Sequence, residues 1–342
     1  MTVDSSAVRK NLERLSSRGF PRKIIAVAKA DFYGCGASFC SKIIDKISAL
    51  GVATIEEGIR LRPFCDKPII IFGYVPIEKY PSAYTHDLSL TIYSKQVALA
   101  LAAFAEKSGA LLKAHLKINT GMNRFGVSYE DVSEINEIFS LQNLFIEGIY
   151  THFATADDSF YQIQRERFLG VYRYLSQKGK TFRFVHTDNT AASLYGTPCG
   201  NAVRIGYGMY GFQKQLTPAI RISGRIAQIR SLERGEGIGY GLTYVATERR
   251  DIAVVSVGYA DGYPRDMSNV GKVLFHGEFL PVVGRVCMDC LFVDVTGKNA
   301  REGDYVVLLG ADGDKIISPD DLGFGYEVLC RFGALRGEKI YK

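Results

Sequence analysis

The chain has 342 residues, of which 47% are hydrophobic and 23% are charged, and its formal net charge is +6. This length suffices for two domains or for one large barrel with an appendage, and no apolar stretch reaches the roughly 18 residues needed to span a bilayer. Lysines and arginines are scattered among acidic residues, so we expect neither a nucleic-acid-binding protein nor a membrane protein.

The first residues contain no cationic segment followed by an apolar one, so we expect no secretory signal and a cytoplasmic location. An odd number of cysteines, seven, then favours reduced thiols. Cys287 and Cys290 have the spacing of a redox or zinc motif. No second cysteine pair or histidine cluster accompanies them, and on a strand they would face opposite sides unless the backbone turns. We therefore expect a structural role for this pair and no metal site.

Apolar, β-branched runs recur through the first two thirds of the chain. They predict strands at 24–29, 51–55, 68–73, 88–93, 114–119, 146–153, 182–187 and 202–206. Helical spacing lies between several of them, at 95–106, 130–140 and 160–178. Eight strands that alternate with helices predict an α/β fold of the (β/α)8 (TIM) barrel type. The alternative is a doubly wound open sheet, which usually has fewer strands and a different glycine-rich first turn.

The pattern changes after about residue 215, where strands follow one another without helices. They are predicted at 219–232, 251–258, 272–276, 279–286, 290–295 and 304–309. Turn signals such as Asp261-Gly262 separate them. We therefore predict a barrel domain at 1–215 and a C-terminal, mostly antiparallel β domain at 216–342 that ends in a short tail.

Lys29 follows the first predicted strand, at the end of the barrel where active sites lie. A lysine at a dry strand end can lose its proton and condense with an aldehyde, although it can also snorkel or pair with a carboxylate such as Asp31. The segments His186–Thr190 and Arg204–Gly208 follow the seventh and eighth strands, and offer hydroxyl groups and glycine backbone N–H groups to an anion. A Schiff-base lysine facing a phosphate site suggests pyridoxal 5'-phosphate.

Motifs in order over nearly the whole chain carry a family resemblance. They are residues 26–34, 116–126, 151–154, 186 with 189–190, 204–207, 239–241, 258–265 and 284–289. Through them the chain resembles the alanine racemases, fold-type III enzymes that use pyridoxal phosphate. The resemblance implies a homodimer with shared active sites that interconverts L-alanine and D-alanine, and supplies D-alanine for peptidoglycan synthesis.

The resemblance implies two catalytic bases, because a single base on one face would return the proton to that face. Lys29 forms the Schiff base and handles the α-proton on the D side, and Tyr240 of the partner subunit's β domain handles it on the L side. A free tyrosine has a pKa of about 10, so Tyr240 needs a cationic or hydrogen-bonding neighbourhood. The family supplies this neighbourhood through His152 and Arg204.

Arg204 would face the pyridine nitrogen of the cofactor and, because guanidinium keeps its proton, would leave that nitrogen unprotonated and disfavour transamination. The resemblance also assigns the remaining site residues. Cofactor contacts are Tyr33, His152, Asn189, Thr190, Gly206, Tyr207 and Tyr326. Substrate contacts are Arg124, Met288 and Tyr259. Supporting residues, including an entry gate, are Lys117, His186, Asp289, Asp157, Arg265 and Arg285.

One departure from the family pattern changes a charge. Asn119 stands where an aspartate is usual, beside Lys117, whose equivalent is carbamylated in many members. Thr190 replaces the usual serine and keeps the hydroxyl group.

Three other functions compete. A decarboxylase of basic amino acids or a D-threonine aldolase would share the barrel, but decarboxylation favours an acid, not Arg204, at the ring nitrogen. A non-enzymatic pyridoxal phosphate carrier would lack the β domain. Tyr259 and Tyr326 suit a methyl side chain, yet serine is only slightly larger and stays open as a substrate.

Overall fold

The computed structural model describes residues 1–156 and 158–342, so the predicted gate residue Asp157 lies outside the described residues. The chain divides into two compact units. The barrel unit contains Arg9–Phe32 and Ala37–Met209. The β unit contains Met1–Val8, Tyr33–Gly36 and Tyr210–Lys342. Each unit is therefore built from more than one stretch of sequence.

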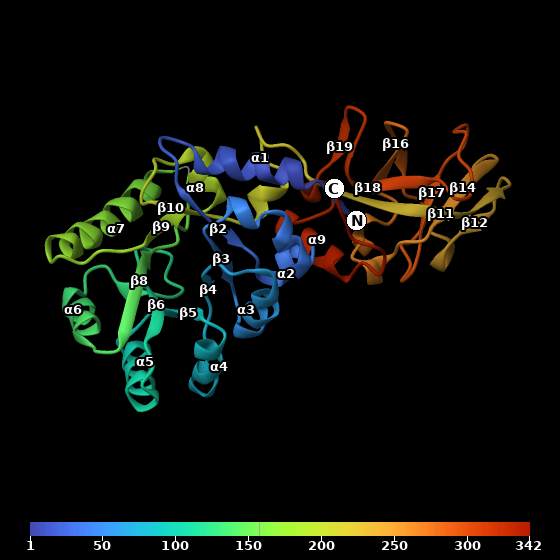
Figure 1. The fold of residues 1–342 in the computed structure, drawn as a ribbon. Coiled ribbons are helices and arrows are strands. Elements are labelled where there is room, and N and C mark those ends of the chain that lie inside the picture. Colours follow the sequence, from blue (N-terminus) through green and yellow to red (C-terminus); the bar gives the residue numbers. More distant parts are fainter. Residues whose placement is uncertain (157) are drawn as a thin grey trace. The chain divides into compact units, whose positions relative to one another are not determined.

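The barrel unit is a closed ring of eight parallel strands (Figure 1). The strands are β2 (Lys23–Val27), β3 (Ala49–Val52), β4 (Ile69–Ile71), β5 (Leu88–Ile92), β6 (Leu112–Asn119), β8 (Leu144–Tyr150), β9 (Phe184–Asp188) and β10 (Ala202–Ile205). Pairing of β10 with β2 and of β5 with β6 closes the ring, and the short β7 (Val127–Ser128) pairs with β6. The prediction of a (β/α)8 barrel is confirmed, and the open doubly wound sheet is wrong.

Helices cover the outside of the ring, as Figure 1 shows for α5, α6 and α7. The helical segments are α1 (Ser5–Ser16, shared by both units), α2 (Lys29–Tyr33), α3 (Ile55–Leu61), α4 (Tyr80–Thr85), α5 (Lys95–Ser108), α6 (Val132–Ser140), α7 (Ser159–Gln177) and α8 (Thr190–Tyr195). Side-chain oxygens of Ser94, Asp131 and Asp158 accept backbone N–H groups at the starts of α5, α6 and α7. These three helices match the predicted ones.

The strands of the ring are buried because parallel strands are covered on both faces. All residues of β3 and β4 are buried, which agrees with their unbroken apolar sequences. The predicted strand 51–55 is displaced, however. The observed strand β3 runs from Ala49 to Val52, and Thr54 caps α3, which begins at Ile55. A threonine N-cap with Glu57 three residues later stops the strand and starts the helix.

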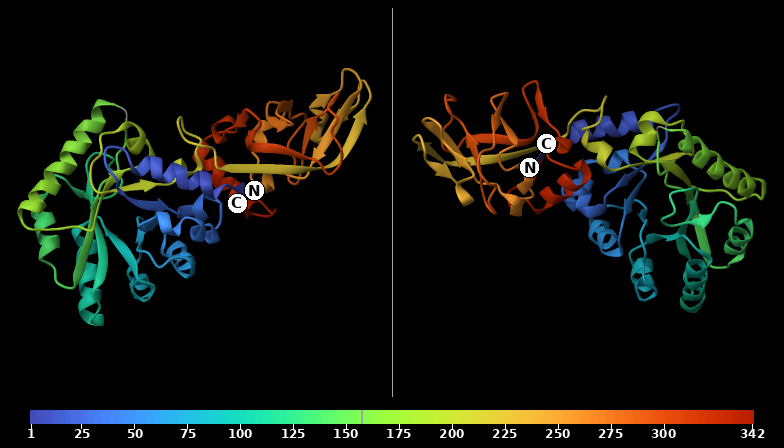
Figure 2. Two further views of the ribbon diagram at one scale, coloured as in Figure 1. Left: turned by 45° about the horizontal axis from the view of Figure 1, so that its top comes forward. Right: turned by 180° about the vertical axis from the view of Figure 1, so that it is seen from behind.

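The β unit is built on a mostly antiparallel sheet. Its strands are β1 (Thr2–Val3), β11 (Ile220–Leu232), β14 (Arg250–Val255), β15 (Lys272–Phe275), β16 (Glu278–Pro281), β17 (Leu291–Asp294), β18 (Tyr305–Asp312), β19 (Lys315–Ile317) and β20 (Ile340–Tyr341). A separate hairpin pairs β12 (Gly237–Ile238) with β13 (Tyr244–Val245). The two chain ends lie side by side (Figure 2), where the Ile340 N–H donates to the Met1 carbonyl oxygen at 2.9 Å.

Two details of the C-terminal prediction are wrong. The predicted strand 279–286 ends at Pro281, and Gly284 at a φ of +68° breaks the extended conformation. The predicted short tail contains the helix α9 (Gly325–Arg331) and β20, which pairs in parallel with β1. Val328 and Leu329 are the buried apolar residues of α9. In a helix of seven residues, two such positions give too short a pattern to recognise in the sequence.

In the described part of the chain, no helix is long and apolar enough to cross a membrane.

Two glycines test the sheet of the β unit. Gly310 in β18 has a φ of +107°, and a Cβ there would lie 2.5 Å from the carbonyl oxygen of Ile220. Gly235 has a φ of +93° with open space around it. Both substitutions by alanine strain the backbone, but only Gly310→Ala also forces the strands β18 and β11 apart. We expect Gly310→Ala to lower the free energy of unfolding by ~1–3 kcal/mol more than Gly235→Ala does, as measured by denaturant unfolding followed by circular dichroism. Equal free energies of unfolding would contradict the close approach.

Candidate active site

Lys29 lies two residues beyond the end of β2, at the carboxyl ends of the barrel strands. The predicted strand 24–29 ends at Val27, so Lys29 follows the last paired residues, and it is exposed in the single chain. The next four residues, Ala30–Tyr33, all have φ between +51° and +56°. Segment α2 is thus a left-handed turn built without glycine, which sequence patterns do not predict.

Arg204, on β10, is a buried cation in the same barrel end, with 4% of its surface exposed. Its guanidinium donates to the carbonyl oxygens of Thr151 (2.8 Å), His186 (2.5 Å) and Thr187 (2.8 Å). Burial lowers the pKa of Arg204 to about 10, so it is still protonated at neutral pH. Among the described residues, no carboxylate forms an ion pair with it.

Arg204 also fixes the tautomers of two histidines. Its Nη1 lies 3.0 Å from Nδ1 of His186, and its Nη2 lies 3.3 Å from Nδ1 of His152. Because guanidinium only donates, both Nδ1 atoms accept and both Nε2 atoms carry the proton. Nε2 of His186 then donates to Nδ1 of the buried His115 at 2.9 Å. Burial, reinforced by the Arg204 charge, holds the pKa of His152 and of His186 well below the usual value, so both rings are neutral.

Lys117 on β6 is a second buried cation. Its Nζ lies 5.5 Å from the ring centre of Phe125 and 5.6 Å from that of Tyr150. Burial and the charges of Arg124 and Arg204 lower its pKa to about 8. Both Lys117 and Arg124 also contribute to the low pKa of His152, which links the four groups electrostatically.

Asn119 is engaged in the loop after β6 rather than with Lys117. Its Oδ1 accepts the N–H groups of Gly121 (3.2 Å) and Asn123 (3.1 Å), and its Nδ2 donates to Oδ1 of Asn123 at 3.0 Å. The first two bonds suit an aspartate equally, but the third needs the amide. Arg124 is the next residue of this loop and is exposed.

Four of the predicted cofactor contacts of the barrel unit, Asn189, Thr190, Gly206 and Tyr207, gather at the start of α8. Asn189 caps this helix by accepting the N–H of Ala192 at 3.0 Å. The Gly208 N–H donates to Oγ1 of Thr190 at 3.3 Å, and a Cβ on Gly208 would lie 2.4 Å from Cγ2 of Thr190. Gly206 and Tyr207 stand just before this close approach, at the start of a 3-10 turn. Tyr33 and Tyr326 lie within the β unit, with ring centres 6.2 Å apart.

The β unit brings the predicted substrate contacts Tyr259 and Met288 together. The Tyr259 N–H donates to the Cys287 carbonyl oxygen, and the Ala260 N–H to that of Met288, both at 3.0 Å. A Cβ on Gly258 would lie 2.3 Å from the latter oxygen, so only glycine fits there. Tyr259 and Met288 are 42% and 52% exposed.

The predicted gate residue Asp289 pairs with Arg336, a residue that the sequence analysis missed. Nη1 of Arg336 lies 2.8 Å from Oδ1 of Asp289, and the same guanidinium binds both carboxylate oxygens of Asp261 at 2.9 Å. The other predicted gate residues, Arg265 and Arg285, are exposed. Their segments are joined through Ser268, whose Oγ donates to the Arg265 carbonyl oxygen and accepts the N–H of Val286.

Tyr240 begins a 3-10 turn between the strands of the β12–β13 hairpin and is 70% exposed. The flanking residues Gly239 and Gly241 have φ of +75° and +71°, a conformation that glycine adopts readily.

Cys287 and Cys290 lie on a tight turn, in which the Cys287 N–H donates to the Cys290 carbonyl oxygen at 2.9 Å. The backbone therefore turns between the two cysteines, which was the condition for both to face the same side. Both pack against an apolar cluster of the β unit that includes Ile238 and Phe292, which supports a structural role.

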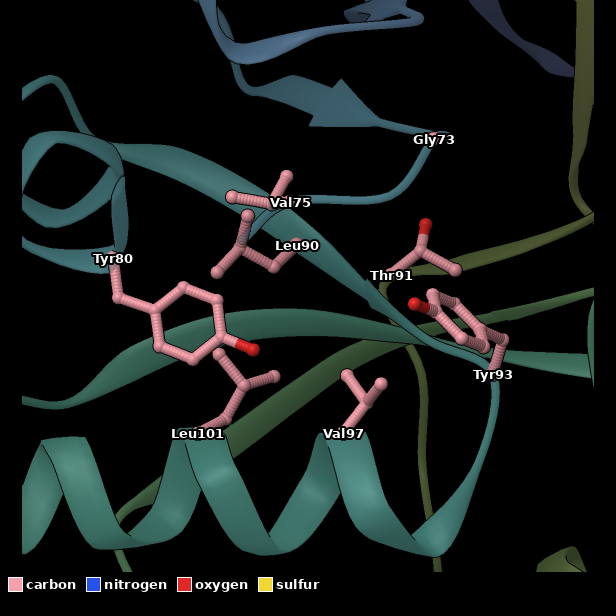
Figure 3. Close-up of a pocket in the computed structure, with 8 residues that line it drawn as sticks. All are labelled: Gly73, Val75, Tyr80, Leu90, Thr91, Tyr93, Val97 and Leu101. Carbon is pink, nitrogen blue, oxygen red and sulfur yellow. The ribbon is translucent and has the colours of Figure 1, made fainter. Parts of the chain in front are cut away.

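A small pocket elsewhere in the barrel unit does not contribute to the site. Figure 3 shows Tyr80, Thr91 and Tyr93 among its eight lining residues, none of which carries a formal charge at neutral pH. Its volume of about 10 Å³ holds at most one water molecule. The Thr91 hydroxyl is already used by the Ile71 carbonyl oxygen and the Tyr150 hydroxyl.

Fold and site together define a (β/α)8-barrel enzyme whose strand ends carry clustered cations. The family comparisons agree. The profile of the alanine racemase N-terminal domain matches residues 3–214, and that of the C-terminal domain matches residues 219–341.

Individual relatives match over nearly the full chain. An alanine racemase of Carboxydothermus hydrogenoformans is 35% identical, over 99% of this chain and 98% of its own. The structure of an alanine racemase of Clostridium difficile 630 is similar with a TM-score of 0.88 at 34% identity, covering 96% and 92% of the two chains. The Bacillus anthracis alanine racemase solved with bound L-Ala-P has a TM-score of 0.87 at 30% identity, covering 97% and 92%.

The chain belongs to the alanine racemase family, whose members are pyridoxal phosphate-dependent isomerases. It is an enzyme that interconverts the two enantiomers of alanine. The decarboxylase, aldolase and carrier alternatives are thereby set aside.

The low pKa of Lys117 gives a test of the cation cluster. In buffer depleted of carbon dioxide, where Lys117 carries a free amine, its modification by an amine-reactive ester, measured by peptide mass spectrometry, should rise with pH through about 8. Arg124→Gln removes one of the charges that lower this pKa, so the midpoint should move to higher pH. An unchanged midpoint in Arg124→Gln would show that Lys117 does not sense Arg124.

Proposed function

We propose that the chain binds pyridoxal phosphate through Lys29 and racemises alanine with two bases, Lys29 and Tyr240, in a homodimer with shared active sites. The observation that carries the proposal is the set of cations at the strand ends of the barrel, without a paired carboxylate among the described residues. We also propose that the division near residue 215 separates the cofactor-binding part from the part that supplies Tyr240.

The residues fit the cofactor, which is an aldehyde carrying a phosphate and a phenolic oxygen. Burial and the charge of Arg204 both lower the pKa values of Lys117 and His152, so an anion beside Arg204 would be bound favourably. The lack of a side chain at Gly208 lets the backbone after β10 pass close to Thr190 at the start of α8, where the proposed phosphate contacts lie. Residues that would hold the cofactor are Lys29, Tyr33, His152, Asn189, Thr190, Arg204, Gly206, Tyr207 and Tyr326.

When bound, pyridoxal phosphate supplies a conjugated ring that withdraws electrons and makes the α-proton of alanine acidic. Residues of the protein carry out the proton transfers themselves. In the proposal, the Nζ atom of Lys29 removes or returns the α-proton on the D side, and the Tyr240 hydroxyl does so on the L side. The two bases thus act on opposite faces of the α-carbon.

Arg204 would act as a fixed donor and not as a proton source. Three carbonyl oxygens hold its guanidinium, and a pKa of about 10 keeps it charged at neutral pH. It would therefore hydrogen-bond a ring nitrogen without protonating it. The neutral His152 presents Nε2–H as a donor, which suits an oxygen that becomes negative, such as that of Tyr240.

The alanine carboxylate would be bound by Arg124 and by the backbone N–H of Met288, with Tyr259 and Tyr326 limiting the side chain. We propose that Lys117 is carbamylated here too. Its pKa of about 8 leaves a substantial neutral fraction to attack carbon dioxide, and Asn119 is occupied by its own loop. A carbamate would turn this cation into an anion that binds Arg124.

The exposure of the β12–β13 hairpin supports the proposed dimer. Tyr240, Leu242 and Val245 of one hairpin are 70%, 58% and 49% exposed, which is unusual for three apolar or aromatic residues so close in sequence. In the proposed dimer, the partner subunit covers this hairpin and Tyr240 enters the partner's site. We further propose a cytoplasmic enzyme that supplies D-alanine for peptidoglycan.

Substitution of each base tests the assignment. Lys29→Ala should lose the visible absorbance of the lysine-bound cofactor, whereas Tyr240→Phe should keep it and lose alanine racemisation. Chiral chromatography of the products with both enantiomers as substrates measures the second effect. Normal racemisation by Tyr240→Phe would make the assignment of this base wrong.

A mixture of the two variants tests the shared site. If Lys29 and Tyr240 of one site come from different subunits, a dimer of Lys29→Ala with Tyr240→Phe contains one intact site. Random exchange makes half of the dimers mixed, so we expect about a quarter of the wild-type activity to return. Analytical ultracentrifugation checks that dimers form. Dimers that exchange subunits and stay inactive would contradict shared sites.

A further inference from the structure

The left-handed turn that follows Lys29 needs an external restraint. Four consecutive residues without glycine, Ala30–Tyr33, adopt positive φ. The left-handed conformation costs such residues roughly 1–2 kcal/mol each, and it persists only where surrounding contacts enforce it. The helical bond from the Phe32 N–H to the Ala28 carbonyl oxygen, at 3.0 Å, offsets only part of this cost.

Phe32 is fully buried and packs on Phe39, with ring centres 5.6 Å apart, and at the start of the turn the carboxylate of Glu57 supplies a second restraint. Its Oε1 accepts the N–H of Ala30 at 2.7 Å, and its Oε2 accepts those of Ala53 at 2.7 Å and Thr54 at 3.3 Å. Hydrogen bonds to an ionised acceptor are about twice as strong as neutral ones. One side chain thus joins the loops that follow two neighbouring barrel strands, β2 and β3.

These contacts exceed what a helix cap requires. Glu57 is the third residue of α3, and with Thr54 it forms a capping box, in which it accepts the N–H of the capping residue. That function accounts for the 3.3 Å bond to Thr54 only. The 2.7 Å bond to Ala30, 27 residues away in sequence, has no part in capping.

Lys29 lies between two restrained residues. On one side, the Ala28 N–H donates to the Gly51 carbonyl oxygen at 2.8 Å and continues the pairing of β2 with β3. On the other side, Glu57 binds the N–H of Ala30. The backbone of Lys29 is therefore fixed from both sides by the β3–α3 segment, although its side chain is exposed.

We infer that Glu57 is a positioning residue, which holds the left-handed turn and through it sets the direction of the Lys29 side chain. The inference rests on the proposed role of Lys29. Glu57 touches neither substrate nor cofactor in this account, and its effect passes through the Ala30 amide. A lysine misplaced by about 1 Å costs roughly a hundredfold in rate.

The test compares Glu57→Gln with two matched variants. The glutamine keeps the length of the side chain but exchanges one acceptor oxygen for an NH2 group, so it cannot serve all three N–H donors. Glu56→Gln alters the neighbouring exposed carboxylate, which pairs with Lys79. Thr54→Ala removes the hydroxyl that caps α3 and keeps the Glu57 carboxylate.

Hydrogen exchange of the cofactor-free protein is the first readout. In Glu57→Gln, amides of the segment 29–34 should exchange at least about tenfold faster, whereas Thr54→Ala and Glu56→Gln should leave that segment unchanged. With pyridoxal phosphate, Glu57→Gln should lower kcat roughly ten- to a hundredfold and change the absorbance of the lysine-bound cofactor. Thr54→Ala should lower only the unfolding midpoint.

Two results would overturn the inference. One is unchanged exchange of residues 29–34 in Glu57→Gln, and the other is a loss of stability alone, equal to that of Thr54→Ala, with normal kcat. A failure of the proposed function is recognised separately, because wild-type protein would then form no lysine-bound cofactor while the exchange result for Glu57→Gln remained.

Discussion

The buried charge of Arg204 is the constraint around which the barrel end is organised. A guanidinium taken out of water needs acceptors, and here carbonyl oxygens of Thr151, His186 and Thr187 provide them. Because these acceptors are neutral, the positive charge is not cancelled. Together with burial, which is the larger cause, it lowers the pKa of His152 and of Lys117, and it makes the end of the barrel suited to an anionic cofactor.

The candidate active-site residues are of two kinds, buried and exposed. Groups of the barrel unit, such as Arg204 and His186, are buried and held by hydrogen bonds, so their protonation and orientation are set before any ligand binds. Groups of the β unit, Tyr240 and Met288, are exposed. An exposed tyrosine is an ordinary surface residue until a partner covers it, which is why the proposed chemistry depends on the dimer.

The sequence predicted the barrel well because parallel strands buried on both faces have unbroken apolar sequences, as in Ile69–Ile71. It also predicted the positions of Arg204 and Thr190, which follow directly from strand ends. The left-handed turn at Ala30–Tyr33 was not predictable, since its residues do not favour positive φ and Glu57, which binds the Ala30 N–H, is 27 residues away in sequence. The hairpin around Tyr240 was not predicted for another reason, because two strands of two residues each show no periodic pattern. Arg336 was missed because its partner Asp289 is distant in sequence.

The most direct test of the two-base account is face-specific proton exchange in deuterium oxide, followed by proton NMR of alanine with the Tyr240→Phe variant. The account predicts that D-alanine exchanges its α-proton for deuterium through Lys29 without inversion, while L-alanine does not exchange. Exchange of both enantiomers at similar rates, or inversion accompanying exchange, would contradict the assignment of one base to each face.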